Sequence, residues 1–173
     1  HSDDGTCAGA WEWIIGASFG TRYSYDMIRN DPSCAPERVF FVKEYSQDIG
    51  TAAVQMKTEG TAMLHMVGVH PVGGGRGVVK YAVRAALAYM AEHGVTEATL
   101  LTDDFRLPAI RTYLEMGFEP IKEDEEMKER WQAVQEKLDG HQKQAIDVIR
   151  LWPEGEIPYW EEGQCIPTLE AYP

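Results

Sequence analysis

Apolar residues recur along the chain at two different periods, and these periods predict which segments are helices and which are strands. Near the N-terminus, apolar positions three and four residues apart predict a helix over 9–20 and a shorter one over 24–32. Three strands are predicted near 38–44, 49–57 and 61–69, where runs of β-branched and aromatic residues are separated by short turn sequences. Connections this short make the three strands an antiparallel meander.

The second half of the chain alternates helices with short strands. Its predicted elements are a helix over 78–94, a strand near 98–102, a helix over 107–117, a short strand over 118–121 and an amphipathic helix over 124–140. Residues 61–102 are therefore expected to form a βαβ unit with a right-handed crossover. The order of elements predicts an α+β fold in which a mixed, mostly antiparallel central sheet carries helices on both faces. We expect one domain over 1–122 and a C-terminal extension over 123–173, which comprises the amphipathic helix and a Pro/Gly/Glu-rich tail.

Composition and charge argue against several classes of function. The chain of 173 residues is 44% hydrophobic and 25% charged and has no apolar run of membrane-spanning length, so we expect a cytoplasmic globular protein. A net charge of −12 argues against nucleic acid as a partner. The three cysteines lie far apart in sequence and fit neither a disulfide framework nor the spacing of a metal site, so no metal is expected.

The most informative stretch is GVHPVGGGRGVVKYAV, residues 68–83, in which a predicted strand leads through four glycines into a helix. The first N–H groups of a helix have no acceptor within the helix, and glycines before them let an anion approach the backbone. Arg76 and Lys80 would add positive charge at the same end. The stretch therefore predicts a phosphate or pyrophosphate site, although the glycines alone fit a tight turn without a ligand equally well. It matches neither a Walker loop nor a dinucleotide-binding fingerprint.

A second motif, AIRTYLEMGFEP at residues 109–120, follows this loop along the chain. Together the two segments resemble the GCN5-related N-acetyltransferases, the GNAT superfamily, whose loop is commonly Arg/Gln-x-x-Gly-x-Gly/Ala. In this chain Gly77 falls on the family's glycine, whereas Gly74 replaces the Arg or Gln and Val79 replaces the last Gly or Ala. The specific motifs lie within residues 66–118.

The resemblance implies that the sheet splays between the strands near 61–69 and 98–102, and that acetyl-CoA binds there as a co-substrate. The end of the first strand would pair with the pantetheine arm, with a β-bulge expected at Gly68, and the loop would hold the pyrophosphate. Arg106 stands where the family often has a cofactor-binding Asn, three residues before Ala109. The expected cofactor-binding residues are Val67, Gly68, Val69, Gly74, Gly75, Arg76, Gly77, Val78, Val79, Lys80, Arg106 and Ala109.

Acetyl transfer to an amine needs a base for the amine proton, donors for the developing oxyanion and a donor for the departing thiolate. Tyr113 matches the family tyrosine that serves the thiolate, and the backbone N–H near Val67 would face the oxyanion. His65 is a candidate base, with His70 as an alternative and a structural role open for both. On an ideal strand, residues 65, 67 and 69 share one face, which would turn His65 toward the cleft.

For two groups of residues the sequence does not identify the interaction partner. Asp103 and Asp104 follow the second strand of the βαβ unit and fit turn or cap positions better than contacts to an acceptor. The helix over 123–139 carries an apolar stripe that must be buried, either on the domain or on the partner of a homodimer. Its members are Met127, Trp131, Val134 and Leu138.

The resemblance thus implies an acetyl-CoA-dependent N-acetyltransferase that moves an acetyl group directly to the amine of a small acceptor. Two alternatives stay open. Gly74 and Val79 favour a non-catalytic acyl-CoA-binding or regulatory module. The tail faintly resembles the lead-in of bacterial α/β-hydrolases and favours a GNAT-like interaction domain of a longer multidomain protein.

Overall fold

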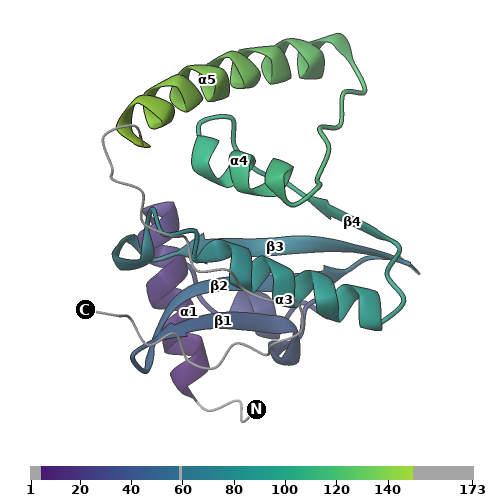
Figure 1. Ribbon diagram of the computed structural model, residues 1–173. Helices are drawn as coiled ribbons and strands as arrows, with labels where there is room; N and C mark the ends of the chain where they lie inside the picture. The colour runs from purple at the N-terminus through teal and green to yellow at the C-terminus, as the bar shows by residue number, and fades with distance from the viewer. Residues whose placement is uncertain (1–4, 59, 150–173) are drawn as a thin grey trace. The chain divides into compact units, whose positions relative to one another are not determined.

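The computed structural model describes residues 5–58 and 60–149, which fall into two compact units (Figure 1). The N-terminal unit, whose described residues run to Leu101, contains α1 (Gly5–Phe19), α2 (Asp26–Arg29), the 3-10 helix η1 (Pro36–Arg38), β1 (Val39–Glu44), β2 (Gln47–Met56), β3 (Thr61–Val69), the 3-10 helix η2 (Pro71–Gly73), α3 (Val79–Glu92) and β4 (Glu97–Leu100). The C-terminal unit starts at Thr102 and contains α4 (Leu107–Glu115) and α5 (Glu125–Ile149). The predicted tail from residue 150 onward lies outside the described residues. Within the described ranges, no helix is both long and apolar enough to cross a membrane.

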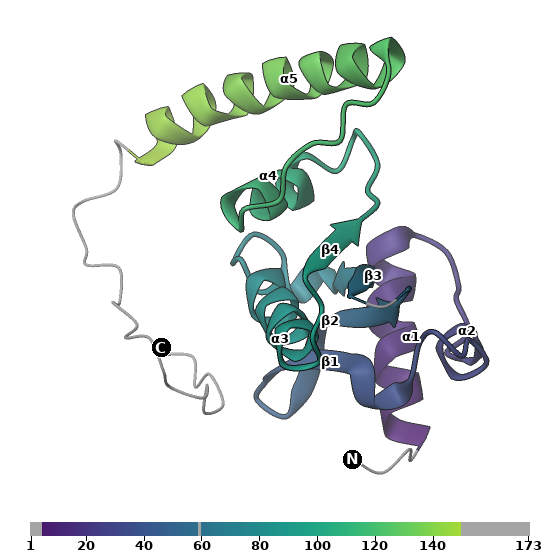
Figure 2. The ribbon, with the colours of Figure 1, turned by 90° about the vertical axis from the view of Figure 1, so that its right-hand side faces the viewer.

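The four strands form one mixed sheet in the order β1-β2-β3-β4. β1, β2 and β3 are antiparallel neighbours, as predicted, and β3 pairs in parallel with β4 after the chain has passed through α3. Helix α1 contacts β2 and β3 on one face of the sheet, and α3 covers the other face (Figure 2). The predicted α+β fold, with its βαβ unit and helices on both faces, is therefore confirmed.

The core between α1 and the sheet explains the apolar spacing of the first helix. Its buried members are Trp11, Ile15, Tyr25, Ile28, Cys34 and Ala53. The rings of Trp11 and Tyr25 meet edge to face with centroids 5.5 Å apart, which joins α1 to the start of α2. Burying one large apolar side chain stabilises a fold by about 1.5–3 kcal/mol, so this cluster fixes α1 on the sheet.

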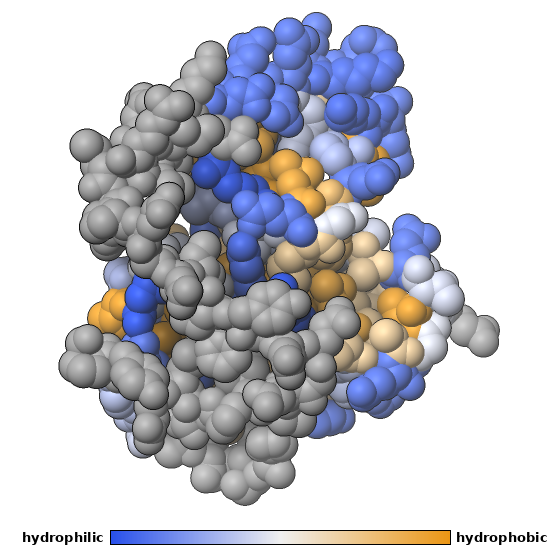
Figure 3. Space-filling view, in the orientation of Figure 1, coloured by the Kyte–Doolittle hydropathy of each residue, from blue (hydrophilic) through white to orange (hydrophobic). Residues whose placement is uncertain are grey.

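The C-terminal unit buries the apolar stripe of α5 on α4. Val134 and Leu138 are buried together with Ile110, and Trp131 packs against the same cluster. Exposed polar residues cover the outer side of α5, which forms a hydrophilic surface in Figure 3. Trp131, Val134 and Leu138 of the stripe are thus covered within the chain, and the homodimer stays a prediction. The helix also extends beyond its predicted end at Gly140, because that glycine does not adopt the left-handed conformation that would stop it.

One predicted strand, over residues 118–121, is wrong. These residues form no strand in the structure. Phe118 instead closes the end of α4, since its N–H donates to the carbonyl of Tyr113 (3.0 Å) and its ring lies edge-on to the Tyr113 ring. Pro120 has no N–H to offer a strand partner, and the side chain of Ile121 is 54% exposed. Phe118 therefore packs on a helix end, and the segment does not join a sheet.

The β-bulge of β3 lies two residues before the expected position at Gly68. Thr51 pairs with Gly68 and Ala53 pairs with His65, so Met66 and Val67 together oppose one residue of β2. Met66 adopts a left-handed backbone conformation with φ of 47°, which produces the bulge. The bulge shifts the alternation of side chains by one position. The expectation that residues 65 and 69 share a face is therefore wrong.

Gly68 is required for close packing rather than for the bulge. A Cβ atom at this position would lie 2.8 Å from Ile15 Cδ1 and 3.3 Å from Ser18 Cβ, both on α1. We expect Gly68→Ala to lower the free energy of unfolding by about 1–3 kcal/mol, because the packed side chains of Ile15 and Ser18 would have to shift. Gly9→Ala is the matched control, since Gly9 lies inside α1 and a Cβ placed there would have nothing within 4 Å, and we expect it to raise stability by up to about 1 kcal/mol. Urea denaturation of both variants measures the difference, and equal stability of Gly68→Ala and wild type would contradict the close approach of α1.

Candidate functional site

The pairing of β3 with β4 stops halfway along β3. The parallel register runs from the pair Thr61–Glu97 to the pair Leu64–Leu100, where β4 ends, while β3 continues to Val69. On the β4 side, no strand among the described residues pairs with residues 65–69, which we call the unpaired end of β3. The peptide groups of a strand edge are ready to pair with another extended chain. This end therefore offers a site for an elongated ligand that carries amide groups.

The unpaired end of β3 leads directly into the glycine loop, residues 70–78, and then into α3. Gly75 and Gly77 have φ angles of 75° and 67°, a left-handed conformation that L residues with side chains rarely adopt. At Gly74 a Cβ would lie 3.1 Å from the Pro71 carbonyl oxygen, so a larger residue such as the family's Arg or Gln would crowd the tight turn of η2. Glycine at Gly74 is therefore matched to the backbone path of this loop.

The start of α3 has no side-chain cap. Its N-cap residue, Val78, makes no capping hydrogen bond, and the Lys80 N–H donates to the Gly77 carbonyl at 3.0 Å. The side chain of Val78 is buried, and its Cγ1 would lie 3.2 Å from a Cβ placed on Gly50. Val78 can therefore contact a ligand only through its backbone. The partial positive charge of the helix N-terminus adds to the N–H groups of the loop and favours an anion.

Arg76, expected as a phosphate contact, is bound to Glu44 at the end of β1. Both terminal nitrogens of its guanidinium contact the Glu44 carboxylate, one of them at 2.9 Å, and Nη2 also donates to the Val72 carbonyl at 2.9 Å. The bond from Arg76 lowers the pKa of Glu44, and the same bond raises the pKa of Arg76. The pair is therefore ionised, and Glu44 offsets the charge that Arg76 brings to the loop. Sequence reasoning gave Glu44 no role, because only the folded register brings it near a residue 32 positions away.

His65 is the first residue of the unpaired end of β3. It pairs with Ala53, which belongs to the core under α1, so the His65 side chain lies on the α1 face of the sheet. Burial lowers the pKa of His65, and the nearby carboxylate of Asp31 only partly opposes this effect. The pKa of Asp31 falls to about 2, because Ser33 donates to its carboxylate from both the hydroxyl and the backbone. His65 is therefore neutral at pH 7 and able to accept a proton.

His70 has a structural role at the entrance of the loop. Its Nδ1 accepts a hydrogen bond from the Val72 N–H at 3.3 Å, which makes His70 the N-cap of η2. Its ring stacks on Trp13 of α1, with centroids 3.6 Å apart and the planes 10° from parallel. The Trp13 side chain remains 39% exposed. Of the two histidines, His65 is thus the better candidate base.

The remaining candidates lie in the C-terminal unit. Tyr113 sits in α4, where it is 8% exposed, and burial raises its pKa to about 12, with Arg106 acting in the opposite direction. Arg106 Nε donates to Asp103 at 2.8 Å, and its guanidinium lies over the Phe105 ring. Ala109 lies in the first turn of α4, and its N–H bonds to the Arg106 carbonyl.

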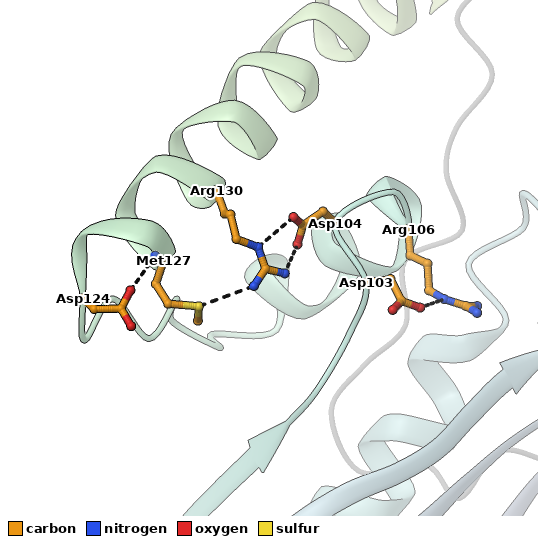
Figure 4. Close-up of polar contacts among 6 residues, drawn as sticks. All are labelled: Asp103, Asp104, Arg106, Asp124, Met127 and Arg130. Carbon is orange, nitrogen blue, oxygen red and sulfur yellow. Dashed lines mark hydrogen bonds and ion pairs between the residues drawn. The ribbon is translucent and has the colours of Figure 1, made fainter.

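Ion pairs fix the segment that leads into α4 (Figure 4). Asp104 accepts two hydrogen bonds from Arg130 of α5, at 2.8 and 3.0 Å, while Asp103 binds Arg106. Asp124 caps α5 by accepting from the Met127 N–H at 2.7 Å. Both aspartates before α4 are therefore engaged by arginines, which agrees with a turn or cap role better than with contacts to an acceptor. The cross-link to α5 had no signal in the sequence.

Comparison with known proteins places the chain in a family. The sequence model of the Acetyltransferase (GNAT) family matches residues 8–118. The chain therefore belongs to the GNAT acetyltransferase family, as the two motifs predicted. No curated protein matches the sequence.

Three solved structures illustrate the likeness of fold. The ribosomal-protein-S18-alanine N-acetyltransferase from Escherichia coli is 18% identical, with a TM-score of 0.58 over 70% of this chain and 77% of that chain. AAC(6′)-Iy, solved with the bisubstrate analogue CoA-S-monomethyl-acetylneamine, is 18% identical, with a TM-score of 0.54 over 66% of this chain and 85% of that one. A chain of the NatC complex bound to Gag peptide and CoA is 23% identical, with a TM-score of 0.61 over 69% and 80%. At these identities the likeness shows the fold.

Proposed function

We propose that the protein is an N-acetyltransferase that moves an acetyl group from acetyl-CoA directly to the amine of a small acceptor. The observation that carries this proposal is the continuity of two features in the N-terminal unit. The unpaired end of β3 offers peptide groups for an extended arm, and the same strand leads into the glycine loop at the start of α3. Coenzyme A has the matching chemistry, since an amide-containing arm joins its thioester to a pyrophosphate.

The residues of the N-terminal unit fit this ligand mainly through their backbone. In the proposal, Val67 and Val69 pair with the arm, and the peptide N–H groups from Gly75 to Val79 bind the pyrophosphate. Lys80, in the first turn of α3, is a further positively charged residue at this end of the helix. A valine can occupy position 79, where the family has Gly or Ala, because in the proposal the backbone of Val79 rather than its side chain contacts the anion.

The proposed chemistry assigns one step to each of three groups. Acetyl-CoA supplies the thioester carbonyl that the amine attacks. His65 takes the proton from the amine nitrogen, and the N–H near Val67 binds the oxygen that becomes negative. The match to the family motif, rather than any placement of the two units, assigns to Tyr113 a hydrogen bond to the sulfur as the C–S bond breaks. With a pKa of about 12, its phenol keeps its proton beside a thiolate whose conjugate thiol has a pKa of about 8.5, so Tyr113 acts as a donor rather than a source of protons.

A non-catalytic acyl-CoA-binding module is the alternative, and the neutralised charge of Arg76 favours it. Two measurements on the full chain separate the possibilities. A thermal-shift assay with acetyl-CoA should raise the melting temperature, and release of free thiol with a panel of small amines should exceed hydrolysis without an amine. Binding without amine-dependent thiol release would favour the module, and no binding would refute the proposal.

The pH dependence of the reaction tests His65. With an acceptor amine of low basicity, which stays neutral above about pH 5, we expect kcat/KM to fall as the pH drops through a pKa below 6.5 and to be flat above it. The sign follows because burial favours neutral His65, and only the neutral ring accepts a proton. His65→Gln should lower kcat by about 10²-fold and remove this acid limb.

A stability measurement distinguishes this role from a change in folding. Because the pKa of His65 is lower in the folded state, the free energy of unfolding should decrease as the pH falls from 6.5 through the folded pKa. His65→Gln should lose that part of the pH dependence. An unchanged acid limb of kcat/KM in this variant would assign the base to another group.

A further inference from the structure

The turn between β1 and β2 holds two residues in a conformation that suits neither of them. Glu44 pairs with Gln47, so the hairpin closes through only two residues, Tyr45 and Ser46. Their φ angles are 48° and 73°. Two-residue hairpin turns with positive φ at both positions favour Asn and Gly, and a bulky tyrosine in this conformation is unusual. Such strain persists in functional regions when another requirement fixes the residue.

Packing in the core does not explain why a tyrosine occupies this strained position. The Tyr45 side chain is 65% exposed at the tip of the hairpin. Val72, which belongs to the glycine loop, is 56% exposed. The N-terminal unit therefore presents an aromatic ring and an apolar side chain to solvent on two neighbouring segments.

Glu44 ties this hairpin to the glycine loop. The residue immediately before Tyr45 binds the guanidinium of Arg76, and Arg76 in turn donates to the Val72 carbonyl. Tyr45 is near enough to Arg76 to contribute to the raised pKa of its guanidinium. The turn that carries Tyr45 is consequently joined to the loop that the proposed function assigns to the pyrophosphate.

We propose that Tyr45 stacks on the purine base of coenzyme A, and that the Glu44–Arg76 pair holds the hairpin at the distance from the loop that this stacking needs. The inference rests on the proposed function, because the base belongs to the same ligand as the pyrophosphate. Tyrosine rings stack on nucleobases through their faces and do not require a buried site. Glycine or asparagine would relax the turn but would remove the ring, which explains why the strained residue is retained.

Two glycine substitutions in the same turn separate the ring from the backbone. Tyr45→Gly and Ser46→Gly each place glycine at a positive φ, so both should raise the melting temperature, by about 2–4 °C. Only Tyr45→Gly should weaken CoA binding, by about 5- to 150-fold, which corresponds to about 1–3 kcal/mol. Ser46→Gly controls for added flexibility of the hairpin, and Tyr45→Phe should keep the affinity because it keeps the ring.

Titration calorimetry with CoA and with acetyl-pantetheine, which lacks the nucleotide, completes the test. Tyr45→Gly should bind acetyl-pantetheine as the wild type does. If wild type binds CoA and Tyr45→Gly binds it equally well, the stacking is wrong while the proposed function stands. Equal weakening of both ligands would assign Tyr45 to the hairpin's shape and overturn the stacking. A wild type that binds neither ligand would overturn the proposed function and this inference together.

Discussion

Replacing Tyr113 with phenylalanine is expected to lower kcat for acetyl transfer by about 10²–10³-fold while the dissociation constant of acetyl-CoA changes little. The expected size is that of removing one preorganised hydrogen-bond donor from a developing negative charge. The substitution removes only the hydroxyl, and the ring keeps its edge-on packing against Phe118, with centroids 6.0 Å apart. Steady-state kinetics of thiol release, with separate titration of acetyl-CoA, measure the two quantities.

The raised pKa of Tyr113 makes this prediction more specific. Because the phenol stays protonated up to a pKa of about 12, the ratio of wild-type to variant rates should be constant between about pH 6 and 9. A proton source with a lower pKa would instead give a ratio that changes over this range. Thr112→Val is a matched control, since it removes the neighbouring hydroxyl of α4, which donates to the Pro108 carbonyl. It should cost about 1 kcal/mol of stability and leave kcat unchanged, whereas full activity of Tyr113→Phe would show that its hydroxyl has no part in the reaction.

The second large effect is expected at Gly75. Gly75→Ala should weaken acetyl-CoA binding by about 10- to 100-fold, the equivalent of one hydrogen bond to a charged group. Nothing lies within 4 Å of a Cβ placed at this position, so the loss would come from the methyl group blocking the approach of the pyrophosphate and from strain at a φ of 75°.

Gly94→Ala isolates the strain from the blocking. Gly94 follows α3 and has a φ of 76°, and a Cβ there also has nothing within 4 Å. Both substitutions should lower the free energy of unfolding by about 1–2 kcal/mol, but only Gly75→Ala should change the dissociation constant of acetyl-CoA. Equal affinities of the two variants would show that the loop does not bind the pyrophosphate through its backbone.

Much of the fold could be predicted because the positions of apolar residues, alternating along strands and three or four apart along helices, directly reflect which side of each element is buried. The three strands of the meander and the helices after the glycine loop were predicted to within a few residues, apart from the far end of α5. The strand predicted over 118–121 was wrong because Phe118 packs on the end of α4, and a short apolar run does not show which neighbouring element its residues contact. The bulge was misplaced because Met66, rather than a glycine, adopts the left-handed conformation.

The residues of the candidate site likewise fall into those that the sequence could predict and those that it could not. Tyr113 and the glycine loop could be proposed because motifs mark them, and His65 because histidine suits a base near neutral pH, and these roles stay predictions. The partners of the charged residues could not be found. The Glu44–Arg76 and Asp104–Arg130 pairs join residues 32 and 26 positions apart, and nothing in the sequence distinguishes these carboxylates from other surface acids. Their pairing depends on strand register and helix packing, which follow only from the folded chain.

The unpaired end of β3 has a consequence for how such a protein can change over evolutionary time. A ligand that is held by peptide groups depends on the course of the main chain, and most side-chain replacements leave that course intact. Under the proposed function, residues around the loop, such as Gly74 and Val79, can differ from the family pattern without loss of the surface that meets the ligand. Selection on such a surface would act on glycine positions, turn lengths and the point where two strands part, so inheritance of function can outlast recognisable similarity of sequence.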